Sequence, residues 1–74
     1  MSRHFRITGK KLVIKLQKMG FECVRVRGSH HRMKHPNGRI TTIPLHGNKE
    51  LSKGLIRKII QEDLKMSIDD FQKK

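Results

Sequence analysis

The chain has 74 residues, of which 34% are hydrophobic, and it carries 18 lysines and arginines against six acidic residues, for a net charge of +12. A chain of this length forms one small domain of marginal stability, because it buries only about 60% of its unfolded surface. Its hydrophobic runs are too short for a membrane span or a secretory signal, and a lone cysteine cannot form an internal disulfide, so we expect a cytoplasmic domain.

The first predicted element is a helix between Thr8 and Gly20. Threonine is a favoured N-cap residue, and hydrophobic side chains then recur at helical spacing through Leu16. Gly20 stands where helices often end in the left-handed conformation, and Phe21 can fold back on Leu16.

Three strands are predicted next. Residues 21–27 are rich in β-formers but alternate imperfectly, which indicates a bulge or a register shift. Residues 29–35 form the second strand, and Pro36-Asn37-Gly38 is a strong hairpin turn. Residues 39–45 form the third strand, where Pro44 marks an edge or an end.

A second helix is predicted after Ser52, a plausible N-cap, with hydrophobic residues at helical spacing through Leu64. The spacing of residues 67–71 indicates a short terminal helical turn. The order helix, three antiparallel strands, helix predicts an α+β fold in which two helices cover one face of the sheet. This fold resembles the double-stranded-RNA-binding domain. We expect residues 1–74 to form a single domain, with Phe5, Phe21 and Phe71 in its core.

The second strand is the most informative segment for function. Alternate side chains of a strand share a face, so His30, Arg32 and Lys34 point one way and His31, Met33 and His35 point the other. Because Met33 is hydrophobic, we expect its face of the strand to pack against the core and the His30 face to be open. Arg25 and Arg27 can extend this basic patch from the first strand, although the bulge leaves their register undecided.

The charge of +12 indicates a polyanionic partner. Nucleic acid is the first candidate and an acidic protein the second. An anionic membrane surface is the weakest, because the cations are not concentrated on one amphipathic helix. Because the chain has three phenylalanines and no Trp or Tyr, stacking on bases is not expected, and a nucleic acid would be held by its backbone.

The open face suits ribonucleolytic chemistry. Cleavage requires proton transfers at the attacking 2′-hydroxyl and at the leaving oxygen, which a histidine such as His30 can perform. Arginine and lysine can stabilise the charge that develops on phosphorus oxygens. A histidine among cations can equally be a residue of a solvated binding patch, and the pattern alone does not choose.

Metal chemistry is not expected. A strand separates His31 from His35 by about 13 Å, too far to share an ion, and the six acidic residues form no carboxylate cluster. Cys23 has no C-x-x-C partner, so a buried structural thiol is predicted.

Two further positions are possible secondary site residues. His46 lies in a loop that could bring it near the sheet edge, or it could cap local backbone. Lys53 lies at the start of the second helix, where backbone N–H groups can bind phosphate, or it belongs to a solvated basic face.

The chain resembles the HicA family, the toxin half of HicA–HicB toxin–antitoxin systems, also described as YcfA-like mRNA interferases. The motifs that carry the resemblance include Leu16-Gln17-Lys18-Met19-Gly20-Phe21, Gly28-Ser29-His30-His31 and His35-Pro36-Asn37-Gly38. They continue through residues 43–51, and together they cover nearly the whole chain. The sequence departs from the family pattern at Met33, where an aromatic residue is common.

The resemblance implies a metal-independent endoribonuclease of mRNA, without a cofactor, that a HicB-type antitoxin neutralises by covering the basic face. It implies that His30 is the catalytic acid or base. Residues expected to bind RNA, with Ser29 positioning the others, are Arg25, Arg27, Gly28, Ser29, Arg32 and Lys34. The second proton-transfer group stays open among His46, His35, Lys34 and water. Two alternatives also stay open: a non-catalytic double-stranded-RNA-binding module, and a module that binds only an acidic protein.

Overall fold

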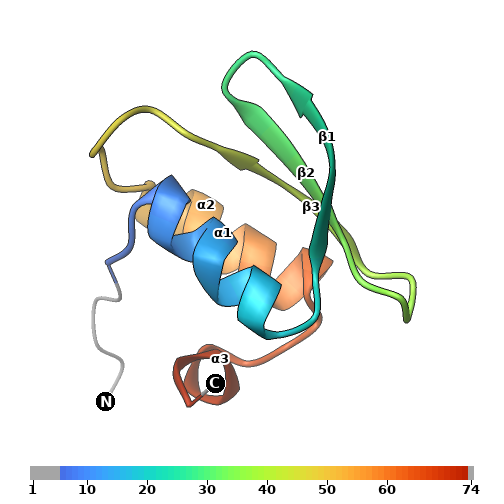
Figure 1. The fold of residues 1–74 in the computed structure, drawn as a ribbon. Coiled ribbons are helices and arrows are strands. Elements are labelled where there is room, and N and C mark those ends of the chain that lie inside the picture. Colours follow the sequence, from blue (N-terminus) through green and yellow to red (C-terminus); the bar gives the residue numbers. More distant parts are fainter. Residues whose placement is uncertain (1–5, 74) are drawn as a thin grey trace.

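The computed structural model describes residues 6–73 and has the element order that the sequence predicts (Figure 1). Three strands form one antiparallel sheet in the order β1-β2-β3, and the helices lie on one face of it. The α+β prediction is therefore confirmed. The elements are α1 (Gly9–Lys18), β1 (Glu22–Arg27), β2 (His30–Lys34), β3 (Ile40–Pro44), α2 (Lys53–Arg57), η1 (Lys58–Asp63) and α3 (Ile68–Gln72).

Both predicted ends of α1 are confirmed. The Thr8 hydroxyl accepts a hydrogen bond from the Lys11 backbone N–H (3.2 Å), which satisfies a free donor of the first turn. Gly20 has a φ of 101°, and the Phe21 N–H donates to the Leu16 carbonyl (2.9 Å). The chain therefore turns directly from α1 into β1, and Phe21 is buried at the turn.

One hydrophobic core joins the helix layer to the inner face of the sheet. Met33 and Ile43 enter it from β2 and β3, and Phe71 enters it from α3 at the far end of the chain. Phe21 and Phe71 are buried as predicted, whereas Phe5 lies outside the described residues. The other buried members are Leu12, Val13, Leu16, Ile56, Ile59, Ile60 and Leu64.

The second helix differs from the single α-helix that its pattern predicts. It begins at the Ser52 cap as expected, but from Lys58 it continues as the π-helical segment η1. The Leu64 N–H donates to the Ile59 carbonyl (2.8 Å), five residues back, which is the bond that defines a π turn. The wider turn allows Ile59, Ile60 and Leu64 to be buried together.

The β2–β3 turn is anchored to the helix layer by Arg39. Its guanidinium donates to the Leu64 carbonyl (2.9 Å) and to the Asn37 side-chain oxygen (3.2 Å), and it lies 5.2 Å from the centre of the Phe21 ring. Gly38 has a φ of 100°, as this tight turn requires. Arg39 therefore holds this end of the sheet against Phe21, which follows α1, and against Leu64, which follows η1.

Two glycines in helices predict opposite effects of the same substitution. A Cβ atom at Gly9 collides with the Pro44 carbonyl oxygen, because α1 starts against the end of β3, whereas a Cβ atom at Gly54 meets no atom of residues 6–73 within 4 Å. We expect Gly9→Ala to lower the free energy of unfolding by about 1–3 kcal/mol. Gly54→Ala should raise it by about 0.5–1 kcal/mol, because alanine favours the helix. Urea denaturation measures both; changes of the same sign contradict this packing.

Candidate functional site

The face of the sheet opposite the helices is open and strongly basic. Residues directly opposite one another on antiparallel strands share a face, so the strand register defines three rows across this open face. His30, Arg32 and Lys34 are all exposed, which confirms the orientation predicted for β2. The first row is Arg27, His30 and Pro44, the second is Arg25, Arg32 and Thr42, and the third is Glu22, Lys34 and Ile40.

A bulge in β1 places both arginines of that strand on the open face. Cys23 pairs with Met33 on the inner face, and the register then shifts so that Arg25, two residues later, pairs with Arg32 on the open face. Without the extra residue Val24, strict alternation would turn Arg25 and Arg27 toward the helices. The irregularity that the sequence predicted is confirmed, and the structure decides its consequence.

The first two rows enclose a shallow hollow of about 140 Å³ beside His30. Three arginines line it, Arg25 and Arg27 from β1 and Arg32 from β2, and none of them forms an ion pair within residues 6–73. Successive rows are about 6.6 Å apart along a strand. A single phosphate group can therefore contact guanidinium groups of the second row while the adjacent ribose lies next to His30.

Thr42 is the fifth residue lining this hollow, and it is not among the site residues that the sequence predicts. It lies on β3 opposite Arg32, with its side chain exposed. In the sequence, its position two residues before Pro44 places it on the same face of the predicted third strand as that proline. Only the register of β2 and β3 shows that it lies opposite Arg32.

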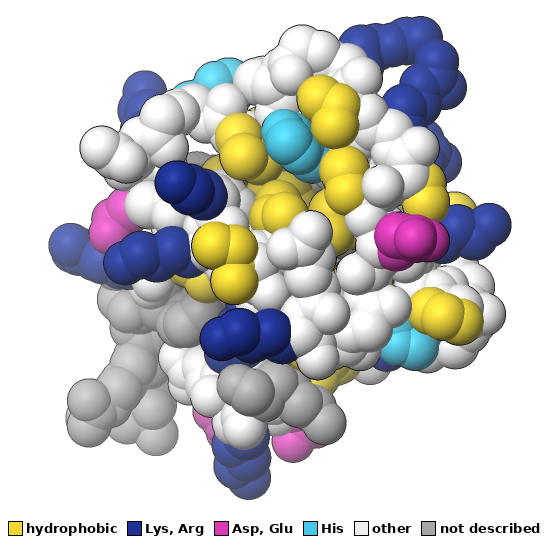
Figure 2. Space-filling view, in the orientation of Figure 1, with side chains coloured by type: hydrophobic (Ala, Val, Ile, Leu, Met, Phe, Trp, Pro, Cys, Tyr) yellow, Lys and Arg dark blue, Asp and Glu magenta, His cyan; other side chains and the backbone are white. Residues whose placement is uncertain are grey.

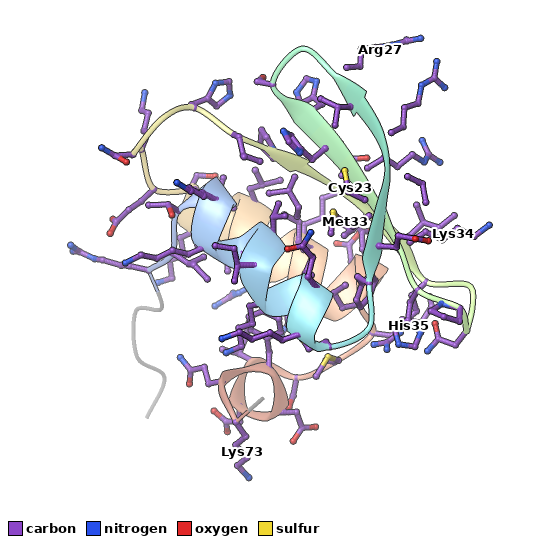
Figure 3. The ribbon with its side chains drawn as sticks, in the orientation of Figure 1. Cys23, Arg27, Met33, Lys34, His35 and Lys73 are labelled. Carbon is purple, nitrogen blue, oxygen red and sulfur yellow. The ribbon has the colours of Figure 1, made fainter. Side chains whose placement is uncertain are left out.

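Lys34 and His35 lie away from the hollow. Lys34 belongs to the third row, about 13 Å along β2 from His30, and Figure 3 shows Arg27 and Lys34 toward opposite ends of the sheet. The ring of His35 packs edge-on against Phe21, with 5.0 Å between ring centres, and its Nδ1 accepts a hydrogen bond from the Asn37 N–H (3.1 Å). Of the four candidates for the second proton-transfer group, these two are therefore badly placed.

The β1–β2 turn presents His30 at the tip of the hairpin. Gly28 adopts a φ of 59° there, and the Ser29 carbonyl accepts a hydrogen bond from the Leu45 N–H (2.7 Å). That bond ties the turn to the end of β3, just before the exposed His46. His46 and the exposed Lys53 do not line the hollow.

Cys23 is only half-buried, so the prediction of a buried thiol is wrong in degree. Its sulfur lies 3.9 Å from Nδ1 of His31 on the inner face of the sheet. Cys23 is partly exposed because β1 is an edge strand, with a neighbouring strand on one side only. Val26, further along the same inner face of β1, is likewise 56% exposed. Figure 2 shows the helix side of the molecule, where hydrophobic side chains gather around a histidine and several Lys and Arg side chains lie beside them.

Within residues 6–73, no three His, Cys, Asp or Glu side chains are grouped so that they could hold a metal ion. In the same part of the chain, no helix is both long and apolar enough to cross a bilayer.

Comparison with known families identifies the chain. The family model described as the HicA toxin of bacterial toxin–antitoxin systems matches residues 9–65, which is well over half of the sequence and includes every residue of the hollow. No curated protein matches the chain. Membership implies a toxin role and an antitoxin as partner. The chain belongs to the HicA toxin family of bacterial toxin–antitoxin systems.

Proposed function

We propose that this toxin is a metal-independent endoribonuclease that cleaves mRNA on the open face of its sheet, with His30 as the catalytic acid or base. The observation that carries the proposal is the hollow in which an exposed histidine is surrounded by Arg25, Arg27 and Arg32. These are the groups that transesterification of RNA needs: one that moves a proton and several that stabilise negative charge on phosphorus oxygens.

In the proposed reaction the 2′-oxygen of a ribose attacks the adjacent phosphorus while His30 takes the 2′-hydroxyl proton. The bond from phosphorus to the 5′-oxygen breaks, and that oxygen takes a proton from a second group or from water. The products are a 2′,3′-cyclic phosphate and a free 5′-hydroxyl. Because Lys34 lies at the far end of β2 from His30 and His35 follows that end, His46 or water is the better candidate for the second proton transfer.

The remaining cations extend the binding surface around this centre. Arg25, Arg27 and Arg32 hold the scissile phosphate, and Lys34 in the third row binds a neighbouring phosphate. Gly28 and Ser29 shape the turn that positions His30. Lys53 at the start of α2 is a secondary contact.

Cleavage of RNA by the purified protein in excess EDTA tests the proposal. We expect fragments that end in a 2′,3′-cyclic phosphate, and we expect a single 2′-deoxy substitution to block cleavage at that position, because it removes the nucleophile. Loss of activity in EDTA, with recovery on adding a divalent metal, would contradict the metal-independent mechanism. RNA binding without any cleavage would instead support the non-catalytic double-stranded-RNA-binding module, with which the α-β-β-β-α fold is also compatible.

RNA affinity should depend steeply on salt through the open face. We expect Arg32→Ala to reduce the slope of log K against log[salt] by about one, because it removes one phosphate contact. Lys73→Ala is the matched control, since this exposed lysine follows α3, on the helix side of the molecule (Figure 3). Equal slopes for Arg32→Ala and the parent would show that RNA binds elsewhere.

For the antitoxin partner, we propose a HicB-type protein that covers the open face and blocks His30. An acidic contact surface suits a chain with a net charge of +12. Binding should raise the melting temperature of this small domain and suppress cleavage together. A complex in which RNA is still cleaved at the full rate would contradict this arrangement.

A further inference from the structure

We propose that Thr42 is a substrate-positioning residue whose hydroxyl donates a hydrogen bond to a non-bridging oxygen of the scissile phosphate, between Arg25 and Arg32. This inference rests on the proposed ribonuclease function and deepens it. It assigns the scissile phosphate to the second row of the open face, with the attacking ribose toward His30 in the first row.

Thr42 lies where it can contact a phosphate that Arg25 and Arg32 bind. It lines the same hollow as His30, and it lies directly opposite Arg32, whose other neighbour across the sheet is Arg25. Thr42 thus completes a row that contains a donor on each of the three strands. The first row ends instead in Pro44, which has no N–H and no polar side chain to offer.

The threonine side chain is chemically suited to orient a phosphate. Hydrogen bonds from a hydroxyl to a charged oxygen are short and directional. A β-branched threonine in a strand has few side-chain rotamers, so little freedom is lost when it binds. Arg25 and Arg32 supply charge on long, mobile side chains, whereas Thr42 supplies a donor at a fixed place. A phosphate held by all three has a defined orientation relative to His30.

The neighbouring Thr41 provides an internal comparison. Its side chain points to the inner face, is 3% exposed and donates to the Asp63 carboxylate (2.9 Å). The hydroxyl of Thr41 therefore has a structural partner within the fold, whereas the exposed side chain of Thr42 lines the hollow. Two adjacent threonines of the same strand, on opposite faces, allow a structural effect to be separated from an effect on the substrate.

The test is single-turnover cleavage by Thr42→Val, Thr42→Ser and Thr41→Val. Valine keeps the shape and strand preference of threonine but removes the hydroxyl. We expect Thr42→Val to slow cleavage about 10- to 100-fold with an unchanged melting temperature. Thr42→Ser should recover most of the rate. Thr41→Val should lower the melting temperature while leaving the rate of the folded protein near that of the parent.

The effect of a phosphorothioate at the scissile phosphate on the cleavage rate distinguishes direct contact with the substrate from a purely structural role. Replacing the oxygen that Thr42 contacts by sulfur weakens the acceptor, so the parent should be slowed by this change in one of the two diastereomers. Thr42→Val should be slowed less, because the hydrogen bond is already absent and the two effects are not additive.

The outcomes separate this inference from the proposed function. If Thr42→Val cleaves at the parental rate, or shows the full sulfur effect, while His30 is required, only the assignment of Thr42 is overturned. If the protein lacking His30 cleaves as well as the parent, the proposed mechanism fails as a whole.

Discussion

Replacing His30 by alanine is expected to slow RNA cleavage by about 100- to 10,000-fold, the usual contribution of a general acid or base. The side chain is exposed in the first row of the open face and lines the hollow with the three arginines. Its removal leaves the three arginines of the hollow in place, so the affinity for RNA should stay close to that of the parent. Cleavage is measured in single turnover, and affinity is measured with RNA that carries a 2′-deoxy residue at the cleavage site.

His31→Ala is the matched control, because His31 is the next residue on β2 but points to the inner face beside Cys23. It should leave the cleavage rate of the folded protein unchanged. An equal loss of activity in both variants would indicate damage to the strand rather than loss of a catalytic group. A His30→Ala variant that retains the parental rate would remove His30 from the mechanism.

Phe71→Ala is expected to lower the free energy of unfolding by about 3–5 kcal/mol. The ring is fully buried, and the Lys15 ammonium lies 4.5 Å from its centre, so α3 is attached to the core under the C-terminal turn of α1. A chain of this length has a total stability of about 4–11 kcal/mol. The variant should therefore be partly unfolded at 37 °C, which urea denaturation and the loss of circular dichroism measure.

Ile14→Ala is the control for this prediction, because Ile14 is also hydrophobic but is 43% exposed on α1. Its cost should be within about 0.5 kcal/mol, as for most surface substitutions. Residues beyond 65 lie outside the family match, so this experiment also asks whether the C-terminal helix belongs to the folding unit. A Phe71→Ala variant as stable as the parent would show that α3 is dispensable.

Local signals in the sequence were sufficient for the elements and for the orientation of β2. Thr8, Ser52 and Ser67 each cap a helix with a side-chain hydrogen bond, as their spacing indicated. Met33 identified the inner face of β2, because one buried side chain determines the direction of its neighbours in a strand of period two. The open position of His30 followed from the same alternation.

The tertiary structure determines which residues line the hollow. The sequence indicated a bulge or a register shift within residues 21–27, but not on which face Arg25 and Arg27 would lie, because a shift of one residue exchanges the two faces of a strand. Thr42 and Arg32 are ten residues apart, and only the pairing of β2 with β3 brings them opposite one another. The π-helical turn of η1 likewise depends on packing, since Ile59, Ile60 and Leu64 must all reach the same core.

The amino-acid sequence by itself determined the small basic domain, its order of helices and strands, and the exposed histidine of β2, because capping, turns and hydrophobic period act over a few residues. Only the tertiary structure decided which cations surround that histidine, that Lys34 and His35 lie apart from it, and that Thr42 joins it. Those relations depend on strand register, and register is set by packing between segments that are distant in the chain.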